Sequence, residues 1–211
     1  YTLWHTLSLH DALPISLLPV SAVGRAHATR RLIATARPYH VLLMQLAHDA
    51  SLLAHGPFAT PEALLDHVLR AFAAGAPGHH LLAVKAHPLE DGRVPLPRLV
   101  DRLARRHGIA DRVVCLSGGK LAPLLDHAAS AVTVTSTAAQ QALWRGLPTV
   151  ALGRAVYAKP GLVDARPLEA VFAWPVPPDR DAYAVFRAYL LATSQFRGGF
   201  YSAAARRSLI R

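Results

Sequence analysis

The sequence has few of the residues and runs that mark several large classes of protein. A single cysteine, Cys115, occurs among its 211 residues, so no disulfide can form within the chain. No apolar run reaches the roughly eighteen residues that a membrane-spanning helix needs. Charged residues make up 17% of the chain and hydrophobic residues 52%, which excludes a disordered protein. These absences favour a globular protein with a buried core, and we expect a cytoplasmic location.

Acidic residues are also scarce, since 13 of them stand against 23 lysines and arginines, for a net charge of +10. The arginines are spread through predicted helices, with a local cluster at Arg206, Arg207 and Arg211. Neither aromatic interleaving nor a nucleic-acid-binding motif accompanies them, so we expect no nucleic-acid partner. A basic surface suits anionic sugars, nucleotides, phosphates or lipid headgroups equally well. The 12 histidines show no metal-ligand spacing, and we expect no metal site.

Short apolar runs alternate with amphipathic stretches along most of the chain. The apolar runs predict strands at 39–46, 81–84, 113–116, 131–134 and 149–152. Helices are predicted from Thr60 to about Gly75 and at 98–107, 121–127, 138–145 and 181–193. Parallel strands joined by helices form right-handed βαβ units. The predicted fold class is therefore α/β, a Rossmann-like parallel sheet with helices on both faces.

We expect three segments along the chain. Residues 1–38 are predicted to be non-native or linker, because the stretch LSLHDALPI at 7–15 resembles translated sequencing adaptor and 17–38 is a linker or a helix. Residues 39–202 are predicted to form one Rossmann-like domain, and 203–211 a basic tail. Regularity decreases after Gly161, and prolines at 175, 177 and 178 exclude a helix at those positions.

The stretch 131–161 carries the strongest functional signal. It reads as a strand, three hydroxyl residues (Thr135, Ser136 and Thr137), a helix, Gly146 and a second strand. The first amides of a helix lack intrahelical partners and lie at the positive end of its dipole. Ser136 and Thr137 can therefore help to bind a phosphate, or they can form an ordinary N-cap without a ligand. The stretch by itself leaves both interpretations open.

Polar residues follow four of the predicted strands, and the carboxyl ends of parallel strands share one edge of a sheet. These residues are His48, Asp49 and Ser51, then Lys85 and His87, then Ser117, Gly118, Gly119 and Lys120, and finally Ser136 and Thr137. No group is specific alone, since 85–88 can be a surface turn and 118–119 a plain turn. The chain has neither a Walker motif nor a GxGxxG fingerprint. The repetition over four loops predicts one shared ligand site.

Several motifs together resemble a known family. A lysine-x-histidine-proline motif occupies 85–88, and 135–137 take the place of an asparagine-serine-threonine motif. The segment 153–157 reads glycine, arginine, alanine, valine, tyrosine; the turn at 55–58, the two glycines at 118–119 and residues 199–201 also match. Over roughly residues 39–202, the chain resembles the donor-binding half of the capsule polysaccharide biosynthesis and export family. These are bacterial 3-deoxy-D-manno-octulosonic acid (Kdo) transferases of GT-B architecture.

The resemblance implies a glycosyltransferase that moves Kdo from CMP-Kdo to a lipid anchor or an earlier Kdo of the capsule linker. It implies CMP-Kdo as the donor with no further cofactor, an anionic lipid or Kdo-lipid acceptor, and the capsule export machinery as a partner. The location it implies is the cytoplasm or the inner face of the inner membrane. Asp49 and His87 are the catalytic candidates, and the donor phosphate is assigned to Lys85, Ser136, Thr137, Gly118, Gly119 and Lys120.

Two departures from the family pattern matter. Thr135 replaces the usual asparagine and removes an amide donor. GT-B enzymes place the active site between two Rossmann domains, whereas the sequence predicts one, so we expect the acceptor half to be missing and the chain to be inactive alone. Two alternatives stay open: a non-catalytic export or assembly factor that keeps a nucleotide-sugar-binding fold, and another GT-B enzyme with contacts for a diphosphate.

Overall fold

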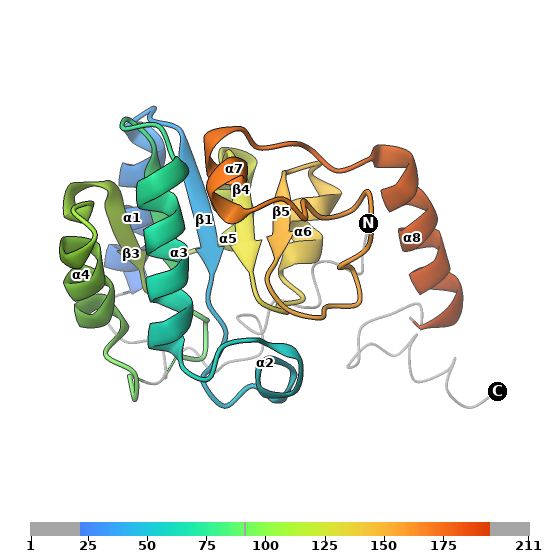
Figure 1. Cartoon of the computed structure of the whole chain (residues 1–211), viewed down its shortest axis with the longest axis horizontal. Coiled ribbons are helices and arrows are strands. Elements are labelled where there is room, and N and C mark those ends of the chain that lie inside the picture. Colours follow the sequence, from blue (N-terminus) through green and yellow to red (C-terminus); the bar gives the residue numbers. More distant parts are fainter. Residues whose placement is uncertain (1–21, 91, 195–211) are drawn as a thin grey trace.

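The computed structural model describes residues 22–90 and 92–194, and its centre is a five-stranded parallel sheet (Figure 1). The strands lie in the order β3-β2-β1-β4-β5, and each neighbouring pair is parallel. They are β1 Tyr39–Leu43, β2 Leu81–Lys85, β3 Val113–Leu116, β4 Ser130–Thr133 and β5 Thr149–Ala151. All five lie where the apolar runs predict them, although β1 ends three residues before the predicted limit of 46. The predicted α/β fold class is confirmed.

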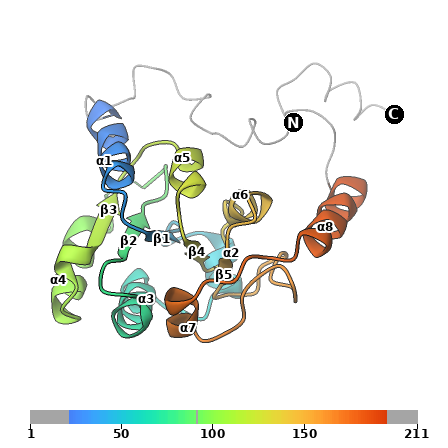
Figure 2. The ribbon, with the colours of Figure 1, turned by 90° about the horizontal axis from the view of Figure 1, so that it is seen from above.

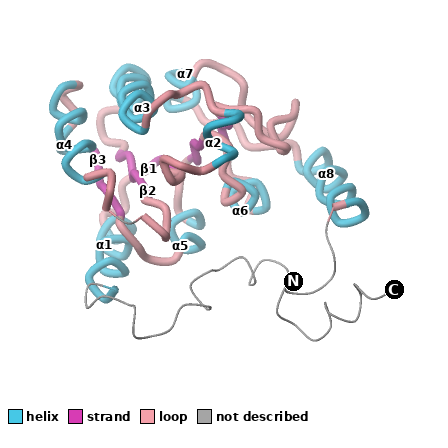
Figure 3. Tube along the Cα trace, turned by 90° about the horizontal axis from the view of Figure 1, so that it is seen from below, coloured by secondary structure: helices cyan, strands magenta, loops and turns pink. Residues whose placement is uncertain are grey.

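Helices cover both faces of this sheet (Figure 2). One face carries α3 Pro61–Gly75, α4 Leu96–Arg106 and α7 Leu168–Ala173, and the other carries α1 Ala22–Ala34, α5 Leu121–Asp126 and α6 Ala139–Trp144. The short helix α2, Ala50–His55, lies near the carboxyl ends of the central strands (Figure 3). Helix α8, Arg180–Thr193, lies beyond the β5 side of the sheet, and a 3-10 turn, Ala110–Arg112, precedes β3.

Side chains of the central strands enter two separate cores. Leu42 of β1 and Val84 of β2 pack in the core beneath α3, α4 and α7. Their neighbours Val41 and Ala83 pack on the opposite face with residues of α1 and α5. Successive residues of a strand point to opposite faces, so a sheet covered on both sides needs apolar residues at every position. This requirement explains why the strands read as continuous apolar runs.

The structure forms a helix within 17–38, which is one of the two predicted alternatives, and it has two short helices that are not predicted. Residues 17–38 are predicted as linker or helix, and the structure forms α1 there, with Leu32 packed in the same core as Val41. Helices α2 and α7, of six residues each, are not predicted. The predictions for 1–16, for 199–201 and for the tail 203–211 lie outside the described residues.

Helices α3 and α7 touch at a glycine. Gly75 ends α3, and a Cβ added there would overlap the backbone carbonyl of Glu169 at the start of α7. A backbone atom cannot move aside as the end of a flexible side chain can. The close contact between these helices therefore requires the absence of a side chain at this position.

We expect Gly75→Ala to lower the free energy of unfolding by about 1–3 kcal/mol, because the overlap outweighs the better helix propensity of alanine. Denaturant unfolding measures this change. The matched control is Gly78→Ala, since a Cβ at Gly78 meets nothing within 4 Å. A Gly75→Ala protein as stable as the control contradicts the proposed contact.

A buried histidine lies near the amino end of the central strand pair. His40 is fully buried; its Nδ1 lies 2.8 Å from Ser130 Oγ and its Nε2 lies 3.0 Å from His80 Nδ1. Its ring packs edge-on against Phe172, with 5.0 Å between centroids. Burial lowers the pKa of His40 from 6.5 to about 3, and the nearby His80 and Arg112 add to the shift. The folded protein therefore keeps this ring neutral.

Stability should fall as the pH falls from neutral, because unfolded His40 takes up a proton below about pH 6.5 and folded His40 does not until about pH 3. Between about pH 7.5 and about pH 5, His40 should cost roughly 2 kcal/mol of unfolding free energy. Urea unfolding at both pH values measures the loss, and His40→Asn should show a smaller one. A ring titration by NMR that finds His40 at an ordinary pKa refutes the expectation.

Candidate functional site

The chain runs from β1 toward one edge of the sheet and from the neighbouring β4 toward the other edge, so the strand order reverses between them. We call this reversal the switch point. Open α/β sheets bind their ligands at the carboxyl ends of the strands beside such a reversal. The loop after β1 leads to Asp49, and the loop after β4 contains Ser136. Lys85 ends β2, the strand that pairs with β1 on its other side. These three predicted site residues therefore stand at one edge of the sheet.

The loops after β1 and β4 are joined by a buried amide. The Thr135 backbone N–H donates to Gln45 Oε1 at 2.8 Å, and Gln45 Nε2 donates to Thr135 Oγ1 at 3.0 Å. The Ser51 hydroxyl donates to the same threonine oxygen at 3.2 Å. Sequence reasoning missed Gln45; the available signal is a single polar residue at the end of a long apolar run. Thr135, at the usual asparagine position, is therefore committed to holding the two loops together.

Asp49, a predicted catalytic residue, begins helix α2. Its Oδ1 accepts hydrogen bonds from the backbone N–H groups of Ser51 at 2.8 Å and Leu52 at 3.3 Å. Aspartate is among the favoured N-cap residues, so this contact accounts for the start of a six-residue helix that periodicity does not predict. Its other oxygen, Oδ2, lies 3.5 Å from Gln45 Nε2. Asp49 is thus attached to the loop junction through one oxygen and caps α2 with the other.

The lysine-x-histidine-proline motif lies at the end of β2. Lys85 is buried, and its Nζ donates to the carbonyl of Ala86 at 3.2 Å. His87 Nδ1 accepts the backbone N–H of Leu89 at 3.1 Å, which leaves the Nε2 of a neutral ring as its donor. Burial lowers the pKa of His87; the Asp49 carboxylate opposes this shift and Lys85 adds to it. These charges act on one another because the loops after β1 and β2 are neighbours.

Ser136 follows β4 and opens the turn into α6. Its hydroxyl accepts the backbone N–H of Ala138 at 3.2 Å, and its carbonyl accepts the buried hydroxyl of Tyr157 at 2.6 Å. Burial raises the pKa of Tyr157, so the phenol keeps its proton and remains a donor. Thr137, the next residue, is exposed. The tyrosine of the 153–157 motif thus holds the hydroxyl loop, residues 135–137, in place.

A glycine allows that motif to pack against the β4 loop. A Cβ on Gly153 would lie 2.8 Å from both the carbonyl of His55 and the methyl carbon of Thr135. The backbone N–H of Arg154 donates to the same His55 carbonyl at 3.0 Å. The turn at 55–58 and the segment at 153–157, noted separately in the sequence, therefore contact each other at the switch point.

The predicted phosphate-binding residues Gly118, Gly119 and Lys120 lie farther out. They follow β3, the edge strand, where Gly119 has a φ of 82° and Lys120 directly precedes α5. Neighbouring strands are separated by about 4.8 Å, so β3 and β4 lie about 14 Å apart. A ligand that contacts both this loop and Ser136 must cross the ends of β2 and β1. The glycine loop is thus one strand away from Lys85 and three strands away from Ser136.

Two further observations concern the part of the chain that the structure describes. Across 22–90 and 92–194, no three His, Cys, Asp or Glu side chains gather as a group that could hold a metal ion. Within the same residues, no helix is both long and apolar enough to cross a bilayer.

Curated relatives resemble this chain over most of its length. Two capsule polysaccharide modification proteins LipB, from Neisseria meningitidis serogroups A and B, are 31% identical to it over 165 residues, which are 78% of this chain and 39% of each relative. The capsule polysaccharide export protein KpsS of Escherichia coli is 28% identical over 163 residues, 77% of this chain and 42% of the relative. The chain therefore spans about two fifths of the length of these relatives.

Solved structures with a similar arrangement are more distant. A β-Kdo 2,7-transferase, KpsC of Thermosulfurimonas dismutans, aligns over 79% of this chain and 56% of its own, with 20% identity and a TM-score of 0.46. WaaG, a glycosyltransferase involved in lipopolysaccharide biosynthesis, aligns over 64% of this chain and 33% of its own, with 17% identity and a TM-score of 0.39.

A family model covers the whole of the described region. It is that of the capsule polysaccharide biosynthesis proteins, and it matches residues 20–201. The match includes the loops after β1, β2, β3 and β4 and the 153–157 segment. This chain belongs to the capsule polysaccharide biosynthesis protein family.

Proposed function

We propose that this chain is the donor-binding part of a glycosyltransferase that transfers Kdo from CMP-Kdo to a lipid or Kdo acceptor during capsule synthesis. The observation that carries the proposal is the grouping of a buried lysine, a histidine and a hydroxyl loop at one switch point. Family membership supports a role in capsule biosynthesis. The resemblance noted in the sequence supplies the donor and the reaction.

The chemistry of these residues suits a nucleotide with one phosphate. Lys85 would place a positive charge beside the phosphate and stabilise the negative charge that grows on departing CMP. Its burial strengthens that interaction, because charges attract more strongly away from water. Nε2 of His87 would donate a proton or a hydrogen bond to the phosphate. Ser136 and Thr137 would donate hydroxyl hydrogens from the opposite side of the switch point.

We propose that catalysis needs more than this chain. The curated relatives are more than twice as long as the matched segment. A donor bound at the edge of one Rossmann-like unit still needs a second surface that brings the acceptor hydroxyl to the sugar. The chain alone should therefore bind CMP and leave Kdo untransferred until the acceptor half is present.

A second candidate function is a non-catalytic assembly or export factor that keeps the nucleotide-binding fold. The similarity to KpsS, a capsule polysaccharide export protein, favours this alternative. A third candidate, another GT-B enzyme, would bind a uridine diphosphate sugar and need contacts for two phosphates. Calorimetric titration of CMP, CMP-Kdo and a UDP-sugar separates the three, since the Kdo transferase should prefer the cytidine nucleotides and the export factor should bind none.

Replacing Lys85 or Ser136 by alanine should weaken CMP binding by about 1–3 kcal/mol, because each removes a charge-assisted hydrogen bond to the phosphate. Calorimetry measures the dissociation constant, and a thermal melt confirms that each variant is folded. Lys159→Ala is the control, since it removes one exposed positive charge from a loop away from the β2 end. Unchanged CMP affinity in both site variants would exclude them from the donor site.

Asp49 allows a sharper test, because asparagine also caps helices well and carries no charge. If Asp49 acts as a base through Oδ2, Asp49→Asn should abolish Kdo transfer in the full-length protein while it keeps the stability of α2. Asp49→Ala should lose both the transfer and about 1 kcal/mol of stability. Transfer by Asp49→Asn at the wild-type rate assigns the residue to capping alone.

A further inference from the structure

Tyr157 is a buried phenol next to the proposed donor site. Its side chain is almost fully enclosed, and its hydroxyl donates to the Ser136 carbonyl at 2.6 Å. The backbone N–H of Ala139, the first residue of α6, donates to the same carbonyl at 3.1 Å. A carbonyl oxygen has two lone pairs, so these two donors can occupy both of them. The backbone at Ser136 is therefore held from two elements, α6 and the 153–157 segment.

The ring of this tyrosine is held by two helices. It packs in one cluster with Leu143 of α6, and Tyr183 and Phe186 of α8 pack against the same cluster. By contrast, Val185 and Tyr189 of α8 are 70% and 63% exposed. The cluster therefore connects α8, which lies beyond the β5 side of the sheet (Figure 2), to the hydroxyl loop.

The hydroxyl loop carries donors that the described fold does not use. Ser136 Oγ accepts the backbone N–H of Ala138 at 3.2 Å, and this contact leaves the hydroxyl hydrogen free. Within residues 22–90 and 92–194, the hydroxyl hydrogens of Ser136 and Thr137 have no acceptor. Both hydroxyls project from the backbone that Tyr157 holds. A shift of that backbone would therefore move both donors.

We propose that Tyr157 is a positioning residue of the donor site: its hydroxyl fixes how the loop presents Ser136 and Thr137 to the donor phosphate, and α8 holds its ring. This inference rests on the proposed function, in which those two hydroxyls bind the phosphate of CMP. Hydrogen bonds weaken steeply as they depart from linearity, so a small rotation of the loop lowers the affinity for the phosphate. The affinity for the nucleoside cytidine should not depend on Tyr157.

Tyr157→Phe removes the hydroxyl and keeps the buried ring. Calorimetry on the whole 211-residue chain gives the ratio of the cytidine dissociation constant to that of CMP, which isolates the contribution of the phosphate. We expect this ratio to fall about threefold to tenfold in Tyr157→Phe. A residue that only stabilises the fold would lower the melting temperature and leave the ratio unchanged.

The matched control is Tyr183→Phe. It removes a phenol hydroxyl from the same cluster, and that hydroxyl bonds no group within the two described ranges, 22–90 and 92–194. The ratio should keep its wild-type value in this control. An equal fall in Tyr157→Phe and Tyr183→Phe would show a general effect of the cluster and overturn the proposal.

A second pair of variants tests the part of α8. Phe186→Ala removes a ring that packs against the cluster and should lower the same ratio. Val185→Ala shortens the exposed side chain of the preceding residue and should leave the ratio unchanged. An unchanged ratio in a folded Phe186→Ala protein overturns the role of α8, and an unchanged ratio in Tyr157→Phe overturns the whole proposal.

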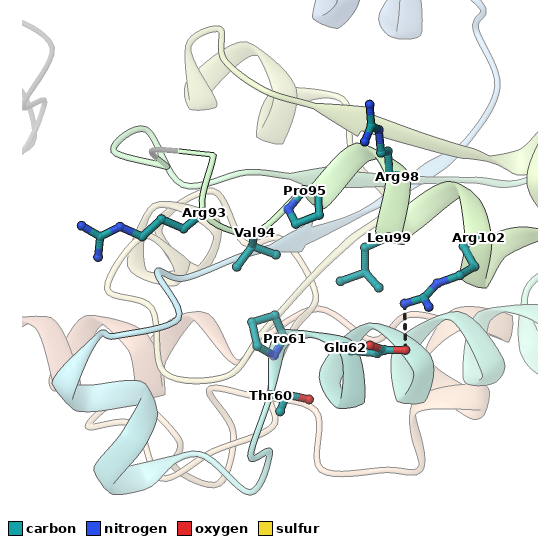
Figure 4. A pocket seen from close by; sticks show the side chains of 9 residues that line it. All are labelled: Thr60, Pro61, Glu62, Arg93, Val94, Pro95, Arg98, Leu99 and Arg102. Atoms are coloured by element: carbon teal, nitrogen blue, oxygen red, sulfur yellow. Dashed lines mark hydrogen bonds and ion pairs between the residues drawn. The ribbon is translucent and has the colours of Figure 1, made fainter.

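A basic groove elsewhere on the molecule needs its own control. It lies between the amino ends of α3 and α4, has a volume of about 490 Å³, and is lined by Arg93, Arg98 and Arg102 together with Glu62 (Figure 4). None of the predicted donor-site residues lines it. The double variant Arg98→Gln with Arg102→Gln should keep the wild-type ratio. A fall as large as that in Tyr157→Phe would place the phosphate at the groove and overturn the proposal.

The wild-type chain separates failure of this inference from failure of the proposed function. If it binds cytidine and CMP equally, or binds neither, the proposed donor site is wrong and the role of Tyr157 is wrong with it. A wild-type preference for CMP that Tyr157→Phe fully retains overturns the positioning role alone.

Discussion

The parallel pairing of β1 with β4 is the constraint on which the rest of the site depends. It brings together residues ninety positions apart, and the buried Gln45 side chain bonds both the backbone and the hydroxyl of Thr135. Each bond contributes about 1 kcal/mol on its own, but breaking one would leave a buried polar group unsatisfied, which costs more. The two loops are therefore held in one relative position, and Ser51 and Asp49 extend that network into α2.

Buried polar residues occur at both ends of the sheet, and their surroundings differ. Near the amino end, His40 and Ser130 bond each other, the His40 ring packs edge-on against Phe172, and the lowered pKa of His40 keeps the pair neutral. At the carboxyl end, Lys85 is a buried cation beside the half-buried His87. A neutral pair enclosed in a core stabilises the fold, whereas a cation at a strand end can act on an anion from outside. We therefore expect the ligand site at the carboxyl ends of the strands and not at their amino ends.

Sequence reasoning finds the strands and the longer helices because burial on both faces leaves continuous apolar runs, and α3 has a clear helical period between Thr60 and Gly75. It finds the edge of the sheet at which Lys85, His87 and Ser136 stand, because parallel topology sends all strand ends the same way. It does not find α2, whose first residues are interpreted as a polar loop after the first strand, or α7, which lies in the irregular stretch after Gly161. Gln45 is also missed, because its role depends on a partner that only the folded chain brings near.

The resemblance identifies the 153–157 segment as a motif, and the structure supplies its physical role. A trans peptide is planar, so the N–H of Thr137 points away from the carbonyl of Ser136. That carbonyl accepts the Tyr157 hydroxyl at 2.6 Å, and burial keeps the phenol protonated. The N–H of Thr137 therefore points away from Tyr157. Gly153 permits this arrangement, since a side chain there would collide with Thr135 and His55. The orientation of the hydroxyl loop thus depends on a residue twenty-one positions later in the chain.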